Sequence, residues 1–299
     1  MTQKITPIPT AVSQNSPVSP PPQEPFGTYL PKGFVARAVG WTRQLKSRWL
    51  HVRLASALRK LAMKTLGTSA VDTLTLGAKM RLFPHNNLCD KRILFTPQLF
   101  DVVERQWLAE TVQAANDAGK GFAFVDIGAN VGAYSLFVAA LAGPGARILA
   151  VEPQPDIFAR LTANIGFNSF GSIMAVDCAV ADKPGELTLF LDPRNKGESS
   201  VRLLRSSATT AVKVPAVTLL QLLLDKGYTH VDAMKLDVEG AEDLILEPFL
   251  RTAPENLWPR MIVIEDSANR WQVDLCALLL ASGYREMAHT RLNFVYQRG

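Results

Sequence analysis

The feature that most constrains the fold of this chain is a glycine loop that follows an apolar run and an acid. Residues 124–132 read Phe-Val-Asp-Ile-Gly-Ala-Asn-Val-Gly, and a helical pattern follows from residue 133 to residue 142. A strand that ends at Asp126 and enters such a loop predicts a crevice at the carboxyl edge of a parallel sheet, where open α/β sheets bind ligands. Gly128 and Gly132 lack a Cβ, so the main chain can turn tightly there and approach a ligand closely.

This loop differs from the G-x-G-x-x-G loop that binds the phosphates of dinucleotides. Its spacing is D-x-G-x-N-x-G, with Asp126 at the entrance and Asn130 in the middle. A carboxylate at the entrance favours a ligand with positive charge and hydroxyl or amino donors, such as S-adenosylmethionine, over a ligand with two phosphates. The alternative left open is a glycine-rich turn that binds nothing.

A second acid follows the next apolar run. Residues 148–151 end at Glu152, which lies 26 positions after Asp126, or one helix and one strand further along. An acid at this place in a nucleotide-type βαβ unit accepts hydrogen bonds from ribose hydroxyls. Glu152 is therefore a candidate cofactor ligand, with a solvated acid at a strand end as the alternative. Asp177, at the end of the third predicted strand, is a weaker candidate for a contact with adenine.

The predicted strand 231–236 carries charge on one face. Lys235 and Asp237, and with them Glu239, fall on one side by the period of two residues. Charged side chains on an otherwise apolar strand are costly to bury unless they pair or meet a ligand. A catalytic role and a purely structural Lys235–Asp237 pair both remain open.

Apolar runs and helical patterns alternate along the chain. The predicted core strands lie near 122–126, 147–152, 172–177, 231–236 and 261–265, and the predicted helices near 133–142, 155–167, 219–226, 241–250 and 271–282. The last of these strands ends in Glu265, so four strands end in acids at one edge. Residues 285–297 predict an antiparallel hairpin that closes the sheet. This order indicates an α/β fold with a doubly wound, mostly parallel seven-stranded sheet.

The segments around this core are less regular. Residues 73–83 predict a short β region, and residues 101–118 predict a helix before the first core strand. Between residues 180 and 218 lies an insertion with a predicted strand at 186–191 and a polar loop at 192–200. This insertion is a candidate for the region that faces the acceptor.

Four motifs occur in a fixed order, FVDIGANVG, AVEPQP, KLDVEGAE and IVIED, with MRLFPHNN before them and CAVADKPGELTLFL between the second and third. In this order they resemble the FkbM-type family of S-adenosylmethionine-dependent methyltransferases, over residues 78–299. The resemblance implies a class I, Rossmann-like methyltransferase fold and S-adenosyl-L-methionine as cofactor. It also implies methyl transfer to a hydroxyl, often on a sugar, glycolipid or polyketide-like acceptor.

For methyl transfer from S-adenosylmethionine to a hydroxyl, we expect the candidate residues to have the following roles. The residues expected to hold the cofactor are Asp126, Gly128, Asn130, Gly132, Glu152 and Asp177. Asp237 is the first candidate for the base that takes the proton of the acceptor hydroxyl, and Glu239 is the second. Glu265 and His289 are the next candidates for this base. No metal ligand is assigned, although a divalent metal shared by Asp237 and Glu239 is left open.

Two functions of other classes remain. A nicotinamide-dependent oxidoreductase is disfavoured by the missing glycine and by the acid at the loop entrance. A non-catalytic scaffold that holds partners at a membrane would use the same fold. A nucleic-acid methyltransferase is disfavoured because the chain contains no N-P-P-Y or D-P-P-Y motif.

The net charge of +5 comes from one segment. Residues 32–64 hold nine Lys or Arg and no acid, which leaves 23 bases and 27 acids elsewhere, so nucleic acid is not an expected partner of the main domain. The segment predicts a helix with an apolar stripe and basic flanks, formed by Trp41, Leu45, Trp49 and Val52 with Lys46, Arg53, Lys60 and Lys64. Such a pattern is typical of a helix that lies on an anionic membrane surface, so residues 34–64 are a candidate for peripheral membrane contact. Docking on the domain and binding of nucleic acid are the alternatives.

Residues 1–31 contain eight prolines and two charges, which predicts a disordered tail without a secretory signal. The expected organisation is this tail, a basic helical segment at 32–66 and a methyltransferase domain at 67–299. Three scattered cysteines without metal-ligand spacing predict reduced thiols. We therefore expect a cytoplasmic protein, with a peripheral position at the inner membrane face as a further expectation.

Overall fold

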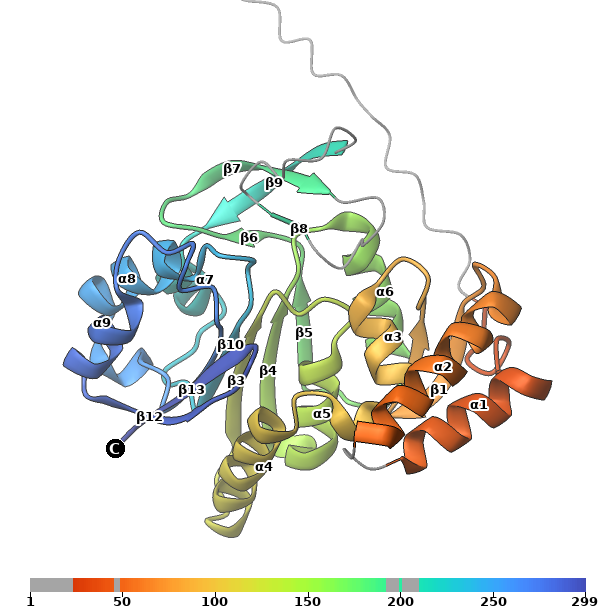
Figure 1. Ribbon diagram of the computed structural model, residues 1–299. Coiled ribbons are helices and arrows are strands. Elements are labelled where there is room, and N and C mark those ends of the chain that lie inside the picture. The colour runs from red at the N-terminus through yellow and green to blue at the C-terminus, as the bar shows by residue number, and fades with distance from the viewer. Residues whose placement is uncertain (1–23, 46–48, 192–198, 201–209) are drawn as a thin grey trace, which may run out of the picture.

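The structure is a computed structural model that describes residues 24–45, 49–191, 199–200 and 210–299. Its centre is a seven-stranded sheet with the order β12-β13-β11-β10-β3-β4-β5 (Figure 1). The strands are β3 (Phe122–Ile127), β4 (Ala146–Val151), β5 (Ile173–Val176), β10 (Ala233–Leu236), β11 (Met261–Glu265), β12 (Tyr284–His289) and β13 (Asn293–Arg298). The strands from β11 to β5 are parallel, and β13 is antiparallel to both β11 and β12. The predicted mostly parallel sheet and its C-terminal hairpin are confirmed.

Helices cover both faces of this sheet. One face packs against α4 (Val102–Asp117) and α5 (Ala133–Ala142), and the other against α7 (Leu219–Asp225), α8 (Glu242–Thr252) and α9 (Leu275–Ala281). Along β3, Phe122 and Phe124 join the first core, whereas Ala123 and Val125 join the second. Because neighbouring side chains of a strand point to opposite faces, one apolar run fills both cores. The sheet is therefore doubly wound, as predicted.

A second, four-stranded sheet forms in the insertion. Its order is β6-β9-β7-β8, with β6 (Ala179–Val180), β7 (Gly185–Leu191), β8 (Ser199–Ser200) and β9 (Thr210–Val217). The predicted strand at 186–191 is confirmed as β7. Most of the polar loop predicted at 192–200 lies outside the described residues. Figure 1 shows this sheet at the top of the view, beyond the ends of the central strands.

Some boundaries differ from the sequence prediction. The β region at 73–83 is an antiparallel pair, β1 (Val71–Thr75) and β2 (Ala78–Leu82), and it leads into α3 (Leu88–Phe95), a helix that the sequence did not predict. The last helix begins at Leu275 rather than at residue 271. The reason lies in two hydrogen bonds: the N–H of Gln272 donates to Asp243 Oδ2 at 2.5 Å, and Asp274 caps α9 by accepting from Ala277. The connection between β4 and β5 is α6 (Pro155–Gly166), as predicted.

The basic segment forms two helices, α1 (Gly33–Gln44) and α2 (Trp49–Leu66), where one helix was predicted. The side chain of Gln98 donates to the carbonyls of Thr42 and Leu45, at 2.8 and 2.9 Å, and so caps the end of α1. Leu45 itself is extended. The prediction of one apolar stripe through this break is wrong, and two of its four side chains lie outside the described part of the chain. Within the described residues, no helix is long and apolar enough to cross a membrane.

The predicted disordered tail does not extend to Pro31. The N–H of Gly27 donates to Asp72 Oδ2 at 2.7 Å, and Asp72 in turn forms a buried ion pair with Arg81. The guanidinium of Arg81 also donates to two carbonyls just before Gly27. Besides pairing with each other, Asp72 and Arg81 thus bind the main chain of residues 24–27 and fix it to the domain. Residues 1–23 lie outside the described residues, and disorder there stays a prediction.

Candidate functional site

A cavity of about 380 Å³ lies at the carboxyl ends of β3, β4, β10 and β11. Val180 and Leu189 of the small sheet also line it. Among the described residues that line this cavity, six are acidic: Asp101, Asp126, Glu152, Asp237, Glu239 and Glu265. Three are basic: Arg92, Lys235 and Arg270. An excess of negative charge in a recessed site favours a ligand that carries positive charge.

Asp126 organises the glycine loop after β3. Its Oδ2 accepts hydrogen bonds from the main-chain N–H and the hydroxyl of Ser135, at 3.0 and 2.6 Å. Ser135 lies in the first turn of α5, so the carboxylate meets the N-terminus of that helix, which is a favourable place for negative charge. Burial raises the pKa of Asp126, although Lys235 and Ser135 act in the opposite direction. Oδ1 of Asp126 is buried and has no partner in the described residues, so it remains available to a ligand.

Two glycines of the loop have different environments. Gly128 lines the cavity, has a φ of +77°, and a Cβ at this position would overlap the carbonyl oxygen of Asp237. Only glycine fits such a contact without a shift of the backbone. Gly132 is not among the residues that line the cavity; a Cβ there would lie 2.8 Å from Leu161 Cδ1. The structure therefore places Gly132 against α6, where it allows the loop to pack.

Glu152 and Asn130 are joined by a hydrogen bond. The N–H of Asn130 donates to Glu152 Oε2 at 2.9 Å, and the N–H of Gln154 donates to Oε1 at 2.9 Å. Burial raises the pKa of Glu152 to about 7, although these two main-chain donors lower it. Each carboxylate oxygen has a second lone pair, so Glu152 can still accept from a ligand hydroxyl. Both residues line the cavity, as the sequence predicted.

Asp177 does not reach the cavity. Its side chain is exposed and it is not one of the lining residues, so the predicted contact with adenine is not supported. The next residue, Cys178, is buried and lines the cavity instead. Neighbouring side chains in extended backbone point to opposite sides, so only one of the two can face inward. The three cysteines are free, as predicted.

The segment after β10 begins with an ion pair. Nζ of the buried Lys235 lies 2.6 Å from Asp237 Oδ2 and 5.0 Å from the centre of the Tyr134 ring. Burial opposes the charged form, but Asp237 and Asp126 raise the pKa of Lys235 above its usual range. The structural pair that the sequence left open therefore exists. It does not remove Asp237 from the cavity, because the side chain of Asp237 stays 35% exposed and lines it.

Glu242 holds this segment in place. Its Oε1 accepts from the N–H groups of Val238 and Gly240, both at 3.1 Å, and its Oε2 accepts from the indole N–H of Trp271 at 2.7 Å. Between these anchors Glu239 has a φ of +58°, in the left-handed region. Glu242 lies in the motif KLDVEGAE, and the sequence pattern indicates no role for it. The available signal was its position in the first turn of a helix, directly after a glycine turn.

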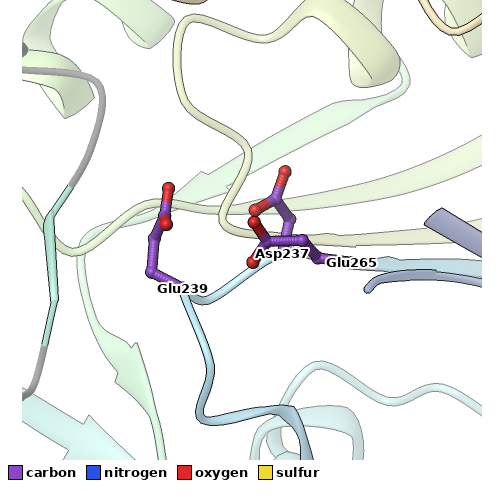
Figure 2. A group of neighbouring side chains, drawn as sticks. All are labelled: Asp237, Glu239 and Glu265. Carbon is purple, nitrogen blue, oxygen red and sulfur yellow. The ribbon is translucent and has the colours of Figure 1, made fainter. Parts of the chain in front are cut away.

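Three carboxylates meet at the ends of β10 and β11. Asp237, Glu239 and Glu265 each offer an oxygen, and these atoms lie within 4.8 Å of one another (Figure 2). Burial, followed by the charges of Asp237 and Glu242, raises the pKa of Glu265 to about 7. Such a group can take up a proton near neutral pH. Its oxygens are also of the kind that bind a divalent cation, the alternative that the sequence left open.

His289, the last of the candidate bases, is not brought to this group. It pairs with Asp266 at 2.9 Å and stacks on Phe294 with 3.9 Å between ring centres. None of these interactions faces the cavity, and His289 is not among its lining residues. The hairpin turns this side chain toward its own partner strand, which the sequence did not indicate.

Several lining residues were not expected from the sequence, among them Asn87, Arg92, Asp101 and Tyr134. Asp101 accepts from the Tyr134 hydroxyl at 3.1 Å and pairs with Arg92 at 3.0 Å. Asn87 donates to the side chain of Asn130 at 2.8 Å, which ties the start of α3 to the glycine loop. The only signal for these residues was the motif MRLFPHNN, which contains Asn87 but suggests no contact.

The chain is similar to known methyltransferases in sequence. The family described as Methyltransferase FkbM domain matches residues 126–292. "Methyltransferase sdnD" of Sordaria araneosa is 31% identical over 172 residues, which cover 47% of this chain. The match spans 64% of that relative, so less than two thirds of its length.

Solved structures show more distant similarity. The METTL16 MTase domain has a TM-score of 0.46 and 14% identity, with 89% of this chain and 91% of that chain covered. An O-methyltransferase from Bacillus cereus, solved in complex with SAH, has a TM-score of 0.41 and 11% identity, with 66% and 80% covered.

Proposed function

Because this chain belongs to the FkbM methyltransferase family, we propose that it methylates a hydroxyl oxygen of a sugar, glycolipid or polyketide-like acceptor. The matched family is one of methyltransferases, and S-adenosylmethionine as the cofactor is part of the same proposal. When bound, this cofactor supplies a methyl group on a sulfonium, with a neutral thioether as the leaving group. The observation that supports the proposal best is that the three neighbouring carboxylates after β10 and β11 share one cavity with the carboxylates after β3 and β4.

The residues at the ends of β3 and β4 fit this cofactor. Asp126 keeps one buried oxygen without a partner in the described residues, and Glu152 retains free lone pairs for hydroxyl donors. The acidic excess of the cavity suits a positive sulfonium. We therefore assign Asp126, Gly128, Asn130 and Glu152 to cofactor binding, and Gly132 to the packing that shapes their loop.

The residues after β10 and β11 fit the acceptor. An alcohol is a weak nucleophile until its proton moves toward a base, and a positioned base contributes about 10²–10⁴-fold. We assign this role to Asp237, whose Oδ2 is fixed by Lys235 while the side chain remains partly exposed in the cavity. Glu239 is the second candidate, and Glu265 can share the proton because the three carboxylates are close together.

The residues around the three carboxylates contribute to the rate in a second way, by holding the carboxylates in place. Glu242 fixes the main chain on both sides of Glu239, so the carboxylates do not need to be ordered when an acceptor binds. Holding two reactants in line converts their encounter into an intramolecular step, for which effective molarities reach about 10⁵–10⁸ M. The small-molecule nature of the acceptor is part of the same proposal.

Family membership sets aside the nicotinamide-dependent oxidoreductase. The test of the proposal uses purified chain, methyl-labelled S-adenosylmethionine and a panel of sugars, glycolipids, polyketide-like alcohols and RNA. Label in an alkali-resistant ether of an alcohol is the expected result. Transfer to RNA alone would contradict it, and bound cofactor without transfer to any acceptor would favour a non-catalytic scaffold. Asp237→Asn should abolish the signal, whereas Asp266→Asn, which changes a residue outside the cavity lining, should keep it.

A further inference from the structure

The exposed face of α2 carries cations and leucines in neighbouring stripes. Arg53, Lys60 and Lys64 are exposed and lie seven and four positions apart. Leu54 and Leu61 are seven positions apart and remain 50% and 53% exposed. With 3.6 residues per turn, these spacings place the three cations in one line and the two leucines in the line beside it.

The opposite face of α2 packs on the protein. Ala55 and Ala62 are buried, and α2 lies against α1, as Figure 1 shows at the right of the view. Small residues on this face allow the two helices to approach closely. The two leucines of the outer face therefore point outward in a folded element. On α1, Trp41 adds a side chain that is 52% exposed.

The segment that forms α1 and α2 is strongly basic. Residues 32–64 contain nine Lys or Arg and no acid, whereas acids exceed bases in the rest of the chain. Lysines and arginines beside exposed leucines complement a surface that is anionic at its headgroups and apolar just below them. We propose that the exposed face of the α1–α2 pair binds an anionic lipid surface.

Binding of nucleic acid would explain the exposed cations of α2 but not its exposed leucines. Phosphates would engage the cations, but the binding of a duplex backbone gives no reason for the exposed Leu54 and Leu61. A lipid surface accounts for both stripes at once, since the leucines enter the interface while the cations meet the headgroups.

The helix pair is fixed to an element that lines the cavity. Arg43 Nε of α1 donates to the carbonyl of Leu94 in α3 at 3.0 Å, and the His85 ring bonds to the carbonyl of Met63 in α2 at 3.1 Å. The first residue of α3, Leu88, is 53% exposed and lines the cavity. If the acceptor is a glycolipid, which rests on the proposed function, the lipid surface would present it beside the cavity.

The test measures sedimentation of the full chain with vesicles, without cofactor or acceptor, so its outcome is independent of methyl transfer. Vesicles of phosphatidylcholine alone are compared with vesicles that also contain phosphatidylglycerol. The wild type should bind the anionic vesicles and lose affinity with added salt. Lys60→Gln/Lys64→Gln should bind roughly 30-fold more weakly, and Leu54→Ser/Leu61→Ser about tenfold more weakly.

Matched variants change the same residue types elsewhere on the surface. Lys120→Gln/Lys183→Gln and Leu224→Ser/Leu280→Ser alter exposed positions far along the chain and should bind like the wild type. Circular dichroism and thermal melting confirm that each variant is folded. The proposal is overturned if the wild type ignores anionic vesicles, if the α2 variants bind as tightly as the controls, or if the chain binds duplex RNA or DNA but not vesicles.

Discussion

The two halves of the cavity use carboxylates in different ways. In the cofactor half, at β3 and β4, Asp126 and Glu152 are buried and three of their four oxygens accept hydrogen bonds from the protein's own chain. In the half that we propose to face the acceptor, at β10 and β11, Asp237, Glu239 and Glu265 are only partly buried, and each offers an oxygen to a group of three within 4.8 Å. The first pair shapes a loop, whereas the second group remains available for chemistry.

This difference has an energetic reason. A buried carboxylate without hydrogen bonds costs several kcal/mol, so burial in the cofactor half requires the donors of the loop and of α5. In the half at β10 and β11, burial and then the charges of Asp237 and Glu242 raise the pKa of Glu265 to about 7. Substitutions in the two halves should therefore separate binding from turnover.

The largest expected effect is on turnover in the acceptor half. Asp237→Asn should lower kcat about 10²–10⁴-fold, because the acceptor hydroxyl loses its base. Affinity for S-adenosylmethionine should change by less than about threefold, since the cofactor half is untouched. Rate measurements at saturating cofactor, together with calorimetry, check both statements. Full turnover in this variant would remove Asp237 from the mechanism.

The next effect concerns the point where the two halves touch. Gly128→Ala places a methyl group on the carbonyl of Asp237 at a backbone φ of +77°, so the loop and the β10 segment must move apart. We expect a loss of roughly 2–4 kcal/mol in the free energy of unfolding, measured with urea. Gly171→Ala, where a Cβ meets open space, is the matched control. Equal midpoints for both variants would show that the halves are not in close contact.

A smaller effect should appear in the pH dependence of the free energy of unfolding. The pKa of Glu265 is about 7 in the fold against a usual value of 4.5, so the folded chain holds a proton that the unfolded chain has released between these values. Its contribution to stability is therefore lost as pH rises from about 4.5 to about 7. Over this range Glu265→Gln should weaken the pH dependence of unfolding by on the order of 1 kcal/mol.

The Glu265 carboxyl should also control how kcat depends on pH. Because the base must be unprotonated, kcat of the wild type should rise through about pH 7, and in Glu265→Gln this rise should move to lower pH. A profile that is identical in the two proteins would place the titrating group outside the acceptor half.

The smallest expected effect is at Asp177. Because this side chain is exposed and outside the cavity lining, Asp177→Asn should leave cofactor affinity within about twofold of the wild type. Calorimetry with S-adenosylmethionine measures it. A tenfold loss would restore the contact that the sequence predicted.

Strand ends were the most predictable part of the molecule. Apolar runs that end in acids located the core strands, and the rule that parallel strands end at one edge brought Asp126, Glu152 and Asp237 to a common cavity. Glu265 joined them by the same rule. The same rule does not decide between Asp177 and Cys178, because it predicts which residues follow a strand but not which of two neighbours faces inward.

Contacts between distant segments could not be predicted. The bond from Asn87 to Asn130 and the cap that Gln98 places on α1 both join residues that are far apart in sequence and outside any periodic pattern. The break between α1 and α2 depends on that cap, so helical periodicity alone predicted one helix. Local patterns thus determined the sheet, while long-range hydrogen bonds determined the cavity wall and the N-terminal helices.

Calorimetric titration with S-adenosylmethionine tests the division of the cavity most directly. Wild type should bind one cofactor per chain, and Glu152→Gln should bind it about ten- to a hundredfold more weakly, because a charged acceptor for hydroxyl donors is lost. Equal affinity in the two proteins, or a wild type that binds no cofactor, would contradict the account.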